Sequence, residues 1–196
     1  NAGRLSVSFQ EEKIIMDLNI IIYGRGGQGA KSAGQVLAEA FALEGKYIKA
    51  FPEYGPERTG APVRAYIKVS NKFIKDYEPI TSADYILVID KFIAHSENFY
   101  QKTKKDTKFI LNSTKIPKDK SFKSYLIDAN KISQEKLGDT KPNTIMLGAF
   151  VKLSNSVKLN SVKKAFRNIF KDKLDEQKIK LNLDLIDLGY NSIKCL

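Results

Sequence analysis

Apolar runs and amphipathic stretches alternate along the chain, which predicts that strands and helices follow one another. Residues 18–23 are an isoleucine-rich apolar run, broken only by Asn19 and followed by a glycine cluster, which is typical of a strand buried on both faces. From Ala30 onward apolar side chains recur at helical spacing, and Gly45 is placed to end this helix at the C′ position. Residues 47–51 predict a second strand. A strand, a glycine turn, a helix and a second strand make up a βαβ unit.

A different pattern follows, in which apolar and polar residues alternate over residues 63–69. Such alternation is typical of a strand with one face against the core. The dipeptide Asn71-Lys72 offers a turn before Phe73-Ile74, so we expect a hairpin between these two runs. Three further buried strands are expected at residues 85–89, 109–111 and 125–127.

The last part of the chain has a helical pattern. Pro142 is placed to open an apolar helix over residues 144–153, and Asn160 or Ser161 can serve as the N-cap of the next helix. A third helical pattern continues to Gly189, where we expect the helix to end.

Together these elements predict an α/β fold, namely a Rossmann-like, doubly wound and mostly parallel sheet with a β-hairpin insertion and C-terminal helices. We expect a single domain over residues 17–196, because no linker or tandem repeat interrupts the pattern. Residues 1–16 are interpreted as an upstream extension or a cloning remnant.

The sequence GRGGQG at residues 24–29 matches the G-x-G-x-x-G turn of dinucleotide-binding folds. In that motif Gly24 allows a tight turn, Gly26 a close backbone approach and Gly29 tight packing of helix on strand. The motif also expects an acidic residue to close the second strand, but Phe51-Pro52-Glu53 stands there. Two interpretations stay open: amides at the helix start face an anion, or the glycines simply let a strand turn sharply into a helix.

The same stretch nearly matches the phosphate-binding loop of NTPases, in which a lysine directly follows the last glycine. Here Ala30 separates Gly29 from Lys31. One extra residue rotates the lysine by about 100° around the helix, away from the phosphates. The spacing therefore argues against an NTPase.

A second unusual stretch is FPEYGPERTGAP at residues 51–62, which is stiffened by prolines and carries Glu57-Arg58 at its centre. A loop that follows a parallel strand lies at the carboxyl edge of the sheet, where α/β proteins build their sites. A rigid connection into the hairpin is the alternative.

With PNTIMLGAF at residues 142–150, these motifs make the sequence resemble the gamma subunit of the 2-oxoacid:ferredoxin oxidoreductases, over about residues 18–189. GPERTGAP at residues 55–62 resembles the pyruvate branch, whereas the 2-oxoglutarate and branched-chain branches tend towards a GPEMRGG-type loop. The resemblance implies a subunit, inactive alone, of a pyruvate synthase. Such an enzyme converts pyruvate, coenzyme A and oxidised ferredoxin to acetyl-CoA, carbon dioxide and reduced ferredoxin.

The resemblance also implies alpha, beta and delta (ferredoxin-like) subunits as partners and ferredoxin as the electron acceptor. Thiamine diphosphate and the [4Fe–4S] clusters would lie in other subunits, coenzyme A would be used by the complex, and this chain alone would bind no cofactor. The sequence agrees, because the only cysteine, Cys195, cannot supply the thiolates of a cluster. A single free thiol also fits a reducing cytoplasm.

We expect no catalytic and no metal-binding residue in this chain, and its lone histidine, His95, makes a poor metal site. Arg58 is the leading candidate for a functional charge, because a guanidinium can form two hydrogen bonds to a carboxylate or phosphate; an interface salt bridge is an equal alternative. Asn143 can be a helix cap or a ligand. The residues expected in binding or in a subunit interface are Gly24, Arg25, Gly26, Gly27, Gln28, Gly29, Tyr54, Gly55, Pro56, Glu57, Arg58 and Asn143.

The formal net charge is +11, and basic and acidic side chains balance in the first hundred residues, so residues 101–196 carry the whole excess. Most of it is lysine on helix-like segments without interleaved aromatics, which favours a solvated face or an acidic protein partner over nucleic acid. No apolar run reaches the roughly 18 residues of a membrane span. The alternatives are a stand-alone NAD(P)-binding Rossmann protein, a gamma subunit of a 2-oxoglutarate or branched-chain enzyme, and a basic nucleic-acid binder.

Overall fold

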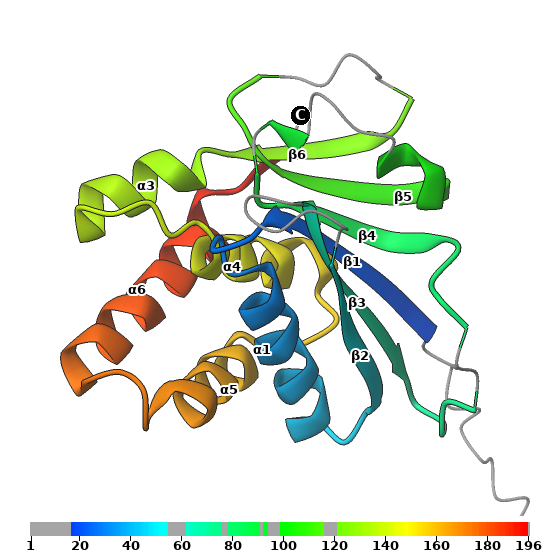
Figure 1. Ribbon diagram of the computed structural model, residues 1–196, viewed down its shortest axis with the longest axis horizontal. Coiled ribbons are helices and arrows are strands. Elements are labelled where there is room, and N and C mark those ends of the chain that lie inside the picture. The colour runs from blue at the N-terminus through cyan, green and yellow to red at the C-terminus, as the bar shows by residue number, and fades with distance from the viewer. Residues whose placement is uncertain are drawn as a thin grey trace, which may run out of the picture.

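A mixed β-sheet forms the centre of the computed structural model, which describes residues 17–54, 62–75, 78–90, 92–93, 99–115 and 121–195. Within these residues seven strands follow the order β2-β3-β1-β4-β5-β6-β7 (Figure 1). Strands β1, β4, β5 and β6 pair in parallel, whereas β3 pairs antiparallel with both β1 and β2, and β7 pairs antiparallel with β6. The strand bounds are Asp17–Arg25 (β1), Tyr47–Tyr54 (β2), Pro62–Ser70 (β3), Ala83–Val88 (β4), Thr103–Asn112 (β5), Lys123–Ile127 (β6) and Lys194–Cys195 (β7).

The predicted β1-α1-β2 unit is confirmed, with helix α1 spanning Ala30–Leu43. Strand β2 runs in the same direction as β1, but β3 lies between the two. Gly45 follows the helix with φ 74°, in the left-handed region that favours glycine, so its predicted C′ role is confirmed. Pro52 lies inside β2, which is possible because β2 is an edge strand.

The predicted partner of the 63–69 strand was wrong. Its hairpin partner is β2, and Phe73-Ile74 is not a strand. The physical reason is that β1 and β2 occupy both edges of β3, so no backbone ladder is left for residues 73–74. Phe73 instead projects into solvent, 68% exposed.

Four helices follow the last parallel strand: α3 (Ala129–Leu137), α4 (Asn143–Ser154), α5 (Leu159–Phe170) and α6 (Glu176–Ser192). A short 3₁₀ helix, η1, spans Phe99–Lys102. Helix α3 was not predicted. The predicted N-cap of α5 was wrong: Lys158 is the cap residue, because its extended backbone is held by an N–H bond to Glu44 Oε1 (2.8 Å) and Leu159 already packs on the core.

Gly189 does not end α6, so that prediction was also wrong. The residue lies at a close crossing with α4, where a Cβ on Gly189 would lie 1.9 Å from the carbonyl oxygen of Ile145. Reciprocally, a Cβ on Gly148 would lie 1.9 Å from the carbonyl oxygen of Ile186. The two glycines therefore let the helix backbones touch, which explains a glycine inside a helix.

The α/β class with C-terminal helices is confirmed. Helices α1, α4, α5 and α6 gather on one side of the sheet (Figure 1), where they build the larger core around residues such as Phe41, Phe150 and Ile186. The other face carries a smaller cluster that includes Tyr66 and Phe109. The described helices α1, α3, α4, α5 and α6 all contribute to the larger core. No helix in this part of the chain is long and apolar enough to cross a membrane.

Candidate functional site

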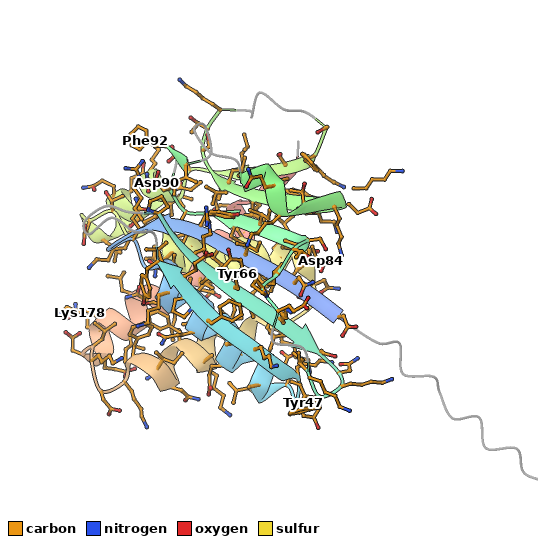
Figure 2. The ribbon with its side chains drawn as sticks, turned by 45° about the vertical axis from the view of Figure 1, so that its right-hand side comes forward. Tyr47, Tyr66, Asp84, Asp90, Phe92 and Lys178 are labelled. Atoms are coloured by element: carbon orange, nitrogen blue, oxygen red, sulfur yellow. The ribbon has the colours of Figure 1, made fainter. Side chains whose placement is uncertain are left out.

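Polar side chains meet where the parallel strands β1 and β4 end side by side. The two strands are in register up to Tyr23 and Val88, and the Ile89 N–H donates to the Tyr23 carbonyl (2.8 Å). The residues that follow, Arg25 and Asp90, therefore leave the same edge of the sheet. Figure 2 shows Asp90 and Phe92 together at this edge, and Asp84 near the opposite end of β4.

The carboxylate of Asp90 is only 4% exposed and is surrounded by donors. Its Oδ2 accepts from Gln28 Nε2 (2.6 Å), and its Oδ1 accepts from the backbone N–H groups of Phe92 (2.8 Å) and Ile93 (3.0 Å). Arg25 Nε lies 3.5 Å from Oδ1. A buried carboxylate needs such partners, and this one joins the glycine loop to the β4 end. Asp90 was not among the predicted site residues. Its position directly after the apolar run at residues 85–89 could have indicated it.

Gln28 closes the glycine loop. Its side-chain Oε1 accepts from the Arg25 backbone N–H (2.8 Å), and its backbone N–H donates to the Arg25 carbonyl (3.0 Å). Gly27 and Gly29 have φ values of 89° and 81°, so the loop turns at these two glycines. The predicted tight-turn role of Gly24 was wrong, since Gly24 lies inside β1. A Cβ there would be 3.0 Å from Ala30 Cβ, so Gly24 lets the helix approach the strand.

Two helix N-termini converge on Gly29, the residue before α1. A Cβ on Gly29 would lie 2.6 Å from Asn143 Nδ2, at the start of α4. Neither N-cap residue, Gly29 nor Pro142, makes a side-chain capping bond, and neither helix has an acidic residue in its first turn. The partial positive charges of both helix ends are therefore not offset by an acid there. Asn143 is the first residue of α4, so it is not the helix N-cap.

Arg25 is the exposed cation of this cluster. Its side chain is 43% exposed, and its guanidinium lies 6.0 Å from the centre of the exposed Phe92 ring as well as beside Asp90. These contacts orient the guanidinium while leaving part of it open to solvent. Gly26, also predicted, lies exposed in the turn that follows.

A hollow of about 340 Å³ adjoins the cluster and shares Phe92 as a wall. Asn112, at the end of β5, organises it: its Nδ2 donates to the Ile89 carbonyl (2.8 Å) and to Asn130 Oδ1 (3.0 Å), and its Oδ1 accepts from the Ala129 N–H (3.0 Å). The ends of β4, β5 and β6 are thus tied together. No group of metal-binding side chains is found among the described residues.

The structure describes the second predicted motif, residues 51–62, only at its ends, residues 51–54 and 62. Tyr54 is exposed at the end of β2, whereas Gly55, Pro56, Glu57 and Arg58 lie outside the described residues. The predictions for these four residues therefore stay predictions.

Glu53 and Arg64 face each other across β2 and β3 at the base of that loop, with Arg64 NH1 3.7 Å from Glu53 Oε2. The Tyr66 hydroxyl donates to Glu53 and accepts from Lys102 Nζ (2.9 Å). The hydrogen bond from Tyr66, with the charges of Arg64 and Lys102, holds the pKa of the Glu53 carboxyl below its ordinary value. Burial and the neighbouring carboxylate raise the pKa of Tyr66, so its hydroxyl stays protonated.

Comparison with known proteins identifies the family. The family model described as pyruvate ferredoxin/flavodoxin oxidoreductase matches residues 19–192. The chain belongs to the pyruvate ferredoxin/flavodoxin oxidoreductase family. The resemblance seen in the sequence is therefore confirmed, and a stand-alone NAD(P)-binding protein is not favoured.

Relatives within this pyruvate ferredoxin/flavodoxin oxidoreductase family match over almost their full length. The chain is 41% identical to the pyruvate synthase subunit PorC of Methanocaldococcus jannaschii over 176 residues, covering 90% of this chain and 97% of that protein. It is 36% identical to PorC of Thermotoga maritima over 179 residues, covering 88% and 93%. The crystal structure of the Thermotoga maritima pyruvate oxidoreductase subunit PORC superposes with a TM-score of 0.80 at 34% identity, covering 91% of this chain and 98% of that one.

Proposed function

We propose that this chain is the gamma subunit of a pyruvate:ferredoxin oxidoreductase, which oxidises pyruvate with coenzyme A to acetyl-CoA and carbon dioxide and reduces ferredoxin. The observation that carries this proposal is the match to pyruvate synthase subunits over nearly the whole of both chains. The partners would be alpha, beta and delta (ferredoxin-like) subunits, in the cytoplasm.

Thiamine diphosphate supplies the electron sink for such decarboxylation, and we assign it, with the [4Fe–4S] clusters, to the other subunits. A cluster needs several thiolates, whereas this chain has one cysteine. The residues of this chain therefore do not fit a cluster, and its part in the reaction is to bind and position.

We further propose that the glycine loop binds an anionic group of coenzyme A. The support is electrostatic: the N-termini of α1 and α4 converge at Gly29, and Arg25 stands beside them with an oriented, partly exposed guanidinium. Helix N-termini and guanidinium groups both favour phosphate oxygens. A carboxylate of a neighbouring subunit is the second candidate for this place, because it would satisfy the same groups.

Kinetics of the assembled complex would test the coenzyme A proposal. In Arg25→Ala we expect KM for coenzyme A to rise about tenfold, the equivalent of about 1.4 kcal/mol, with KM for pyruvate unchanged. Arg167→Ala is the matched control, because the Arg167 side chain is 44% exposed and lies on α5 paired with Glu176. If Arg25→Ala assembles normally and saturates with coenzyme A as before, the loop does not bind it. If assembly itself fails, the loop contacts a subunit instead.

A further inference from the structure

Two aromatic rings meet in solvent at the end of the sheet opposite the glycine loop. Tyr47 begins β2 and Phe73 follows the turn after β3, and their rings pack edge to face with centres 6.0 Å apart. The two residues are 48% and 68% exposed. Strand β1 runs from this end, at Asp17, to Arg25 at the other, which is about 26 Å for its nine residues. Tyr47 and Asp90 accordingly lie at opposite ends of the sheet in Figure 2, so the aromatic pair is separate from the proposed coenzyme A site.

Polar contacts hold the turn that carries the second of these rings. Lys46 Nζ, just before β2, donates to Asn71 Oδ1 (2.5 Å). The backbone N–H of Lys72 donates to Ser70 Oγ (3.0 Å), and Ser70 is the register partner of Tyr47. The turn and the start of β2 are thus tied together. Side chains that are ordered before binding lose less conformational entropy when a partner binds, so the aromatic pair is suited to association.

A groove of about 540 Å³ lies beside the aromatic pair, and we call it the Phe73 groove. Its lining includes Asp17, Ser70, Lys72, Phe73 and Lys75. Lys72 and Lys75 flank the ring in sequence, and both are exposed. No carboxylate of the described residues lies within ion-pair distance of either lysine. The groove therefore joins an apolar centre to two cations that no described carboxylate neutralises.

The fold itself gains little from the Phe73 side chain. An apolar side chain stabilises a fold through the area that it removes from water, and at 68% exposed most of Phe73 stays in water. Isolated exposed apolar residues are common on protein surfaces, but an ordered aromatic pair with cations at its rim is what protein interfaces are enriched in. Such rings often carry a large share of the binding energy. The arrangement thus favours a role in association.

We propose that the Phe73 groove docks an acidic segment of another subunit of the same oxidoreductase complex, with an apolar side chain against the rings and carboxylates beside Lys72 and Lys75. The proposal rests on the proposed function, which makes this chain a subunit. A second copy of this chain is less favoured, because a two-fold contact would set the same lysines against each other in a chain of net charge +11. Nucleic acid is less favoured, because Asp17 lines the groove and would repel a phosphate backbone.

The test uses the complex formed by co-expressing this chain with the other subunits, and the readout is the fraction of this chain that stays bound in gel filtration on dilution and with increasing NaCl. In Phe73→Ala we expect the apparent dissociation constant to rise at least about tenfold. The melting temperature of the isolated chain should stay within about 2 °C of the wild type, because the side chain is mostly exposed. A residue needed only for folding would lower both. Phe73→Leu should bind more tightly than Phe73→Ala, because it keeps a large apolar side chain.

The charge of the rim is tested separately. The double variant Lys72→Glu with Lys75→Glu should be released at lower NaCl than the wild type, whereas Lys72→Arg with Lys75→Arg should stay bound, because the charge is kept. The matched control is Lys164→Glu with Lys171→Glu, which makes the same change at two exposed lysines on α5 and directly after it, and should leave release unchanged. Lys75→Gln removes a single exposed charge and replaces the double variant if that does not fold.

Wild-type association in both Phe73→Ala and the Lys72→Glu, Lys75→Glu variant would overturn the proposal, and so would equal loss in the control. Self-association of the isolated chain in analytical ultracentrifugation, lost in Phe73→Ala while the complex is unaffected, would assign the groove to a second copy. Binding of a fluorescent 20-nucleotide DNA with the same pattern would assign it to nucleic acid. If the wild-type chain does not join the other subunits, or the complex does not reduce ferredoxin with pyruvate, the proposed function itself fails.

Discussion

Asp90 shows how one buried residue can organise a site whose charge is presented elsewhere. It is not open to a ligand, yet it fixes Gln28, which closes the glycine loop, and it orients Arg25. The exposed groups of the loop thus depend on a carboxylate that solvent barely reaches. For the proposed coenzyme A site, this is the usual relation between a binding group and the residue that positions it.

Asp90→Asn tests this arrangement. An amide nitrogen would replace one carboxylate oxygen and face a donor, either Gln28 Nε2 or the backbone N–H groups of Phe92 and Ile93. A buried donor without an acceptor costs about 1–3 kcal/mol. We expect the melting temperature of the isolated chain to fall by about 4–8 °C in a thermal scan. The exposed Asp106→Asn serves as control, and equal melting of the two variants would contradict the role of Asp90.

The Glu53 carboxyl offers a pH-dependent test at the base of the second motif. In Tyr66→Phe the hydroxyl that donates to Glu53 is lost, so the lowered pKa of Glu53 should rise towards its ordinary value. NMR titration of the Glu53 side-chain carboxyl carbon measures this directly.

The sign for stability follows from the direction of the shift. A carboxyl with a lowered folded-state pKa stabilises the fold above its unfolded-state pKa, and this stability is lost as the pH falls through the folded-state value. Tyr66→Phe should therefore lose less stability on acidification than the wild type. An unchanged Glu53 pKa would show that Arg64 and Lys102, and not Tyr66, set it.

At the scale of elements, the α4–α6 crossing decides how the C-terminal helices sit on the core. Gly189→Ala would gain about 1 kcal/mol of helix propensity, but its Cβ meets the backbone carbonyl of Ile145, which cannot swing aside like a side chain. Overpacking of this kind typically costs about 1–3 kcal/mol and sometimes more. Because the Cβ would lie only 1.9 Å from a backbone oxygen, the cost is expected at the top of this range, so after the propensity gain we expect a net loss of about 2 kcal/mol in urea unfolding. Asn191→Ala, on the exposed side of α6, should be near neutral; a neutral Gly189→Ala would mean that the two helices lie farther apart.

The elements also show what could be read from the sequence. The runs at residues 20–23 and 85–89 are apolar throughout, so their strands were predictable from composition alone. Helix α3 has few apolar residues and buries mainly Ala129 and Ser133, so it left no periodic signal. In the sequence alone, Gly189 looks like the end of a helix. Only the facing backbone of α4 shows that the glycine is needed for the close packing of the two helices.

At the scale of the whole molecule, the pairing of distant segments was beyond the sequence. The strand at residues 63–69 is alternating, but no local feature says that β2 and β1 take both its edges. The glycine loop and Asn143 meet in space, and the Gln28–Asp90 bond joins residues 62 positions apart. The motifs could be recognised because their residues are adjacent in sequence. The residues that position them, such as Asp90, lie far away in sequence and could not be found in this way.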